Sequence, residues 1–63
     1  MKYWLPFSAD SGAIWIEGPF ETREQAMAER EKAKSQISPL SKVGSPFVAD
    51  NKDDALKRAH LFL

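Results

Sequence analysis

The stretch 13–36 constrains the fold of this chain more than any other, because it joins an apolar strand to a long polar helix. Ile14 and Ile16 are β-branched and flank Trp15, which favours a strand over a helix. The four consecutive apolar residues at 13–16 indicate that both faces of this strand are at least partly covered. The strand is therefore predicted to lie inside a sheet rather than at its edge.

A helix is predicted from about Arg23 to Gln36. Thr22 is followed three residues later by Gln25, a capping-box pattern in which each side chain bonds a backbone N–H at the helix start. No Gly, Pro or β-branched residue interrupts the good helix formers that follow. Gly18-Pro19-Phe20 is predicted to end the preceding strand, because Gly allows unusual backbone angles and Pro has no amide hydrogen.

An antiparallel hairpin is predicted at the N-terminus. In the stretch 3–7, Tyr3, Leu5 and Phe7 alternate onto one face of a strand. Pro6 removes one donor from a strand ladder, so this strand is expected at a sheet edge or is expected to end early. The Asp, Ser and Gly residues that follow it are typical of a connection to the strand at 13–17.

A third strand and a second helix are predicted near the C-terminus. Phe47-Val48-Ala49 is the short strand, and 40–45 is expected to be irregular. Asn51 is a candidate N-cap for a helix from Lys52 to about Leu61, with acidic residues where the helix dipole favours negative charge. The apolar residues expected to dock this helix follow a helical rhythm and are Ala55, Leu56, Ala59, Phe62 and Leu63.

These elements predict one small α+β domain over residues 1–63, in the order β-β-α-β-α. The simplest arrangement is a three-stranded antiparallel sheet with both helices on one face. With 63 residues there is room for one domain, and the absence of cysteine excludes a disulfide framework or a thiolate zinc site. Gly18-Pro19-Phe20 and Ser45-Pro46-Phe47 each precede a helix, which leaves open either an internal repeat or a simple recurrence of Pro-Phe at turns.

Composition narrows the classes of partner. Nine Lys and Arg residues balance nine Asp and Glu residues, which argues against nucleic-acid binding by bulk charge but leaves a local basic patch open. No apolar run approaches the roughly 18 residues of a membrane span. The N-terminus also lacks the apolar core of a signal peptide. We therefore expect no membrane association and a cytoplasmic location.

The sequence offers no convincing catalytic or metal-binding group. His60 is the only histidine and cysteine is absent, so a catalytic triad would need a near-terminal helix residue. Asp50, Asp53 and Asp54 resemble part of a calcium loop, but its closing glutamate and central glycine are missing, and helix capping explains them. We therefore predict no enzyme activity, no catalytic residues, no metal, no cofactor and no small-molecule substrate.

Aromatic side chains are the candidate binding residues. A sheet with helices on one face leaves part of such side chains on its open face. The candidates are Lys2, Tyr3, Trp4 and Trp15. We favour a protein partner or homodimerisation, through an aromatic sheet face or an edge strand. Nucleic-acid binding by base stacking on the sheet aromatics is the alternative, and the opposing interpretation is that all of these aromatics are core.

The segment from Gly18 to Ala26, with its glycine, aromatic and capped helix, resembles the strand-to-helix junction of two kinds of domain. One is the SPOR domain, which binds septal peptidoglycan, and the other is the AP2-like DNA-binding domain of phage-type integrases. The first has a helix between its first two strands, which is not predicted here. The second reads DNA from a basic sheet, whereas Lys2 is the only cation on these strands. We interpret both resemblances as a local pattern that recurs wherever a strand leads into a helix across a sheet, and not as kinship.

Overall fold

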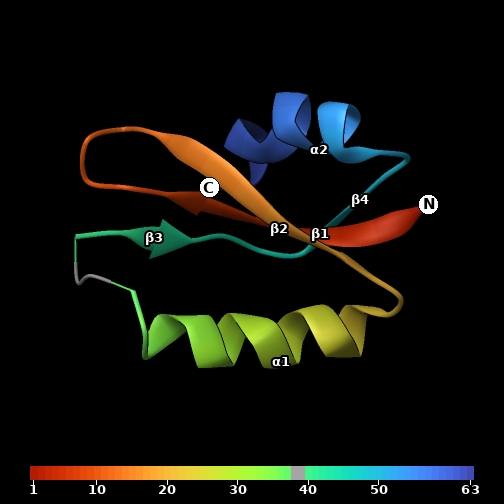
Figure 1. The fold of residues 1–63 in the computed structure, drawn as a ribbon, viewed down its shortest axis with the longest axis horizontal. Helices are drawn as coiled ribbons and strands as arrows, with labels where there is room; N and C mark the ends of the chain where they lie inside the picture. Colours follow the sequence, from red (N-terminus) through yellow and green to blue (C-terminus); the bar gives the residue numbers. More distant parts are fainter. Residues whose placement is uncertain (38–39) are drawn as a thin grey trace.

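The computed structural model describes residues 1–37 and 40–63 and shows an α+β fold, as predicted (Figure 1). Its elements in chain order are β1 (Lys2–Ser8), β2 (Ile14–Phe20), α1 (Arg23–Lys34), β3 (Lys42–Val43), β4 (Phe47–Ala49), α2 (Lys52–Arg58) and a 3₁₀ helix, η1 (Ala59–Phe62).

The sheet is antiparallel and has β1 at its centre. β2 pairs with one side of β1, and β3 and β4 pair with opposite ends of its other side. β3 and β4 therefore form the same edge of the sheet, which is interrupted at residues 44–46. Because of this interruption the sheet has four strands rather than the three predicted. β3 falls within the stretch 40–45, where irregular structure was expected.

The prediction that Pro6 places its strand at an edge is wrong, because β1 is the central strand. Pro6 is opposite Ile16 in the pairing with β2, and its carbonyl accepts a hydrogen bond from Gly44 N at 2.9 Å on the other side. The N–H that Pro6 lacks would point towards the interruption between β3 and β4. The central strand therefore accommodates a proline because the neighbouring edge is broken beside it.

The helices lie on opposite faces of the sheet, so the prediction that they share one face is wrong (Figure 1). Trp4 packs with Ala55 of α2 and Ala59 of η1 in one core cluster. Leu5, the next residue along β1, packs with Ala26 of α1 in the other cluster. Since successive strand residues point to opposite faces, an uninterrupted apolar stretch in β1 requires cover on both sides.

The start of α1 follows the capping box, as predicted. Thr22 Oγ1 accepts a hydrogen bond from Gln25 N at 3.1 Å, and Gln25 Oε1 accepts one from Glu21 N at 2.9 Å. The helix ends at Lys34, two residues before the predicted end. Arg30 is half-buried on the inner side, and its Nε donates to Gly44 O at 2.9 Å, which joins α1 to the interrupted edge.

The second helix begins at Lys52 with Asn51 as its N-cap, also as predicted. Ala55 and Ala59 are fully buried, whereas Leu56 is 47% exposed and Leu63 is 42% exposed, so the prediction that these two leucines dock the helix is wrong. The contact face is narrow because it is formed by alanines. At 100° per residue, Leu56 lies to one side of that face.

β2 continues through Gly18 and Pro19, where a break was predicted. Tyr3 pairs with Phe20 and Leu5 pairs with Glu17, so β2 has one extra residue between these pairs, a β-bulge. Gly18 has a φ of +139°, and a Cβ there would lie 3.0 Å from the Trp4 ring. Glycine at position 18 therefore allows the bulge to pass close over the tryptophan.

Replacing Asn51 by alanine is expected to lower the free energy of unfolding by about 1 kcal/mol, because the Asp54 N–H loses its only side-chain acceptor. Asn51 Oδ1 now accepts that bond at 2.8 Å. Urea unfolding followed by circular dichroism measures the change. Asn51→Asp keeps an acceptor at the same place and should retain most of the stability; an equal loss in both variants would contradict the capping role.

Candidate functional site

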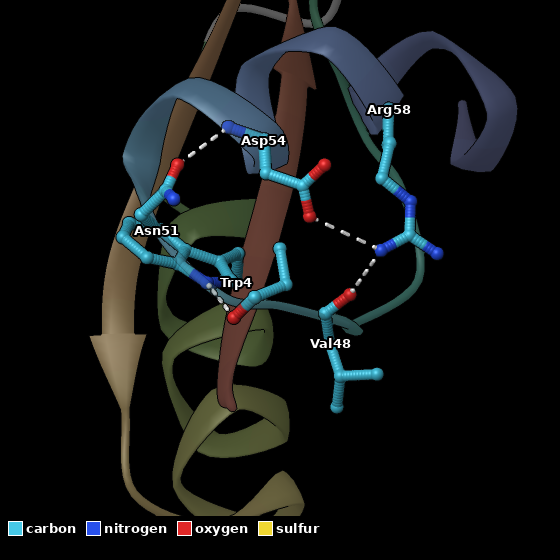
Figure 2. A network of polar contacts seen from close by, with 6 residues as sticks. Trp4, Val48, Asn51, Asp54 and Arg58 are labelled. Atoms are coloured by element: carbon cyan, nitrogen blue, oxygen red, sulfur yellow. Dashed lines mark hydrogen bonds and ion pairs between the residues drawn. The ribbon is translucent and has the colours of Figure 1, made fainter.

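Two of the four predicted binding residues are engaged within the fold. Trp4 is 5% exposed beneath α2, and its indole Nε1 donates to Ala49 O at 3.3 Å (Figure 2). Lys2 is half-buried, and its Nζ forms an ion pair with the Glu21 carboxylate. Trp4 is therefore a core residue.

The other two candidates, Tyr3 and Trp15, lie on the α1 side of the sheet, opposite to Trp4. Both are half-buried, and the Trp15 ring stacks on Phe7 with ring centroids 5.2 Å apart and an interplanar angle of 7°. The four residues are thus divided between two faces, each of which is covered by a helix. The structure does not bring them together as one aromatic surface.

The polar network around α2 holds this helix against β4. Arg58 Nη1 donates to Val48 O at 3.0 Å and to Asp54 Oδ2 at 3.4 Å, while Asn51 caps the helix (Figure 2). His60 is exposed on η1. Within residues 1–37 and 40–63, no three His, Cys, Asp or Glu side chains gather as a metal site. None of the helices described there has the length and apolar character to span a membrane.

The outer edge of β2 has backbone groups directed away from the sheet. Ala9 N donates to Ala13 O at 2.8 Å, and in an antiparallel pair every second residue faces the partner strand. Residues 13, 15 and 17 therefore face β1, whereas the N–H and C=O groups of Ile14 and Ile16 point outwards. In the part of the chain that the structure describes, β1 is the only strand that pairs with β2.

The first half of this edge lacks the features that usually prevent edge-to-edge pairing, namely charges, prolines and bulges. All three occur in the second half of β2, as Glu17, the bulge at Gly18, and Pro19. The segment Ala13–Ile16 contains none of them. The opposite edge is divided into strands of two and three residues. Ala13–Ile16, which comprises the start of β2 and the residue before it and which we call the β2 edge, is therefore the longest stretch open to pairing among residues 1–37 and 40–63.

A groove of about 450 Å³ lies between β2 and α1, next to the β2 edge. Trp15 and Phe20 of β2 and Ala33 of α1 provide apolar lining. Glu17, Glu29 and Lys32 add charged groups. On the other face of the sheet, Ile14 is 39% exposed. A strand added to the β2 edge would therefore find apolar side chains on both of its faces.

Trp15 was among the predicted binding residues and lies at the sheet edge, but the predicted position of that edge is wrong. The stretch 13–16 was predicted as a central strand and the stretch 3–7 as an edge strand or one that ends early, whereas β1 is central and β2 lies at the edge. The available signal was length, because the first strand is apolar over five consecutive residues and the second over four. The longer apolar run marks the strand that is covered on both faces.

Comparisons of the chain with known protein families, with curated proteins and with solved structures each returned no match.

Proposed function

We propose that this protein is a small non-enzymatic interaction module that binds an extended protein segment by adding it as a strand to the β2 edge. The observation that supports this function is the unprotected edge itself. Ile14 and Ile16 direct backbone donors and acceptors outwards from a stretch without charge, proline or bulge. An extended chain has the complementary set of donors and acceptors, and strand addition is an established mode of recognition.

Side chains beside the edge would select among extended segments. In strand addition, backbone hydrogen bonds supply affinity and pockets for alternate side chains supply specificity. Partner side chains on the α1 side would contact Trp15 and enter the groove, and those on the α2 side would contact Ile14. We therefore expect partner segments with apolar residues at alternating positions.

The edge is better suited to this function than the sheet faces. Base stacking on an open face was the alternative, but Trp4 is buried beneath α2 and Lys2 is paired with Glu21. The second tryptophan, Trp15, is half-buried and lies against Phe7. No observation on the described residues favours nucleic acid over a protein segment.

Ile14→Pro is expected to weaken binding of extended peptides at least tenfold, because proline removes an N–H that points outwards and bonds no strand among the described residues. The measurement is selection of a displayed random octapeptide library against the wild type, followed by affinity measurement on the enriched peptides. We expect alternating apolar sequences, bound equally well by the control Ile14→Val, which keeps the N–H.

Two results would contradict strand addition at this edge. One is a library that yields no enriched peptides against the wild type. The other is a set of peptides that binds Ile14→Pro as tightly as Ile14→Val. Urea unfolding of both variants provides the necessary check, because both substitutions should leave the fold intact.

A further inference from the structure

We propose, on the basis of the strand-addition function above, that the segment bound at the β2 edge is the same edge of a second copy. The two β2 strands would run antiparallel about a two-fold axis at Trp15. Such an interface uses the same surface patch twice, as in most symmetric dimers.

The sequence of the edge is self-complementary in this arrangement. Ile14-Trp15-Ile16 reads the same in both directions, so each Ile14 comes opposite Ile16 of the second copy. Because the backbone groups of Ile14 and Ile16 both point outwards, these pairs exchange hydrogen bonds. Moving the axis to Ile14 or Ile16 would bring the turn at Gly12 or the bulge at Gly18 into the paired segment.

On the α1 side, the two Trp15 side chains would come together in the space between the two α1 helices. The two Trp15 residues would form a non-hydrogen-bonded pair, with Cβ atoms about 4.5–5.5 Å apart. α1 contacts β1, β2 and β3, so it is centred near β1. The two α1 helices would then lie about three strand spacings, or roughly 14 Å, apart. Packed helices lie at about 8–10 Å. The two grooves join in this gap, where the Trp15 rings would lie.

The charges permit self-association. Ala13–Ile16 contains no charged residue, and Glu17 comes opposite Ala13 of the second copy, so no like charges lie directly opposite each other in the paired strands. The chain has a formal net charge of zero, which removes long-range repulsion between copies. On the α2 side, the pairing covers Ile14, which is 39% exposed in the single chain.

Sedimentation equilibrium over a wide concentration range tests for the dimer. We expect a reversible monomer–dimer equilibrium in the wild type, with a dissociation constant raised at least tenfold in Ile14→Pro. Ile14→Val should dimerise like the wild type. Leu61→Lys, which changes an exposed leucine on η1, provides a second control and should also dimerise normally.

Disulfide trapping tests the register, because the chain has no cysteine of its own. Trp15→Cys should form a disulfide-linked dimer on mild oxidation, since the two positions lie directly opposite each other. Ile14→Cys alone and Ile16→Cys alone should not, because like positions are offset by two residues along the strands. A mixture of the Ile14→Cys and Ile16→Cys variants should give a disulfide between the two variants. Both variants retain Trp15, so this experiment still tests the register if Trp15→Cys does not fold.

A protein that stays monomeric at all concentrations would overturn the second copy as the partner. A dimer that persists in Ile14→Pro, or that traps Ile14→Cys with itself, would also overturn it. None of these outcomes decides whether the β2 edge binds other extended segments, which the peptide selection tests separately. Peptides that bind the β2 edge of a monomeric chain would support the proposed function and refute self-pairing.

Discussion

Trp4→Ala is expected to cause the largest loss of stability of any single substitution considered for this chain, about 3–5 kcal/mol. Trp4 is 5% exposed and lies in the core cluster that joins β1, β2, β4 and α2. Truncation leaves a cavity beneath α2 and removes the donor that bonds Ala49 O. At about 0.05–0.15 kcal/mol per residue, a chain of 63 residues has a total free energy of unfolding of about 3–9 kcal/mol. The substitution should therefore unfold much of the population.

Urea unfolding of the monomer at low protein concentration measures this loss. Trp15→Ala is the matched comparison, because it removes the same side chain from the neighbouring strand at a half-buried position. Trp15→Ala should lower the free energy of unfolding clearly less than Trp4→Ala, mainly through loss of the stacking on Phe7. If Trp15→Ala proved as costly as Trp4→Ala, the assignment of Trp4 to the core and Trp15 to the edge would be wrong.

The local elements of this fold could be predicted because their determinants are adjacent in the sequence. Thr22 with Gln25 and Asn51 with Asp54 each satisfy a backbone N–H within one helical turn, so both helix starts were placed correctly. The buried alanines also follow from helical spacing, as Ala26, Ala55 and Ala59 show. None of these features depends on what the helix packs against.

The arrangement of the layers could not be predicted in the same way, because it depends on contacts between distant residues. Pro6 indicates an edge strand unless the neighbouring strand is interrupted, and that interruption lies some forty residues away, at 44–46. Leu56 and Ala55 both fit an apolar helix face in the sequence. Ala55 is buried and Leu56 is exposed because the contact between the helix and the sheet is narrow.

The same limit applies to the candidate site. Trp4 and Trp15 occur on neighbouring strands in apolar stretches of five and four residues, so a difference of one residue in length is the only sequence signal that separates core from edge. The difference arises because β3 and β4 pair with β1 and leave β2 with one neighbour in the described part of the chain. Edge character is a property of strand order, which short apolar stretches do not specify.

Gly44→Ala is expected to lower the free energy of unfolding by about 3 kcal/mol, which is the upper end of the usual cost of overpacking. A Cβ at position 44 would lie 2.1 Å from Phe62 O and 2.9 Å from the Pro6 ring. Neither neighbour is a flexible side-chain end, so η1 would have to move away. Phe62 stacks on Phe47 with ring centroids 4.7 Å apart, and displacing it opens the core cluster beneath α2.

Gly12→Ala is the control for Gly44→Ala, because a Cβ at Gly12 meets nothing within 4 Å. Gly12 has a φ of +93°, so alanine there should cost only the backbone strain of about 1–2 kcal/mol. Urea unfolding compares the two losses, and near-ultraviolet circular dichroism reports the packing of the aromatic side chains, including Trp4 in the same core cluster as Phe47 and Phe62. Only Gly44→Ala should change that aromatic signal in the folded state. If it left the signal and stability unchanged, η1 would not be docked on the interrupted edge, and the tolerance of Pro6 in the central strand would need another cause.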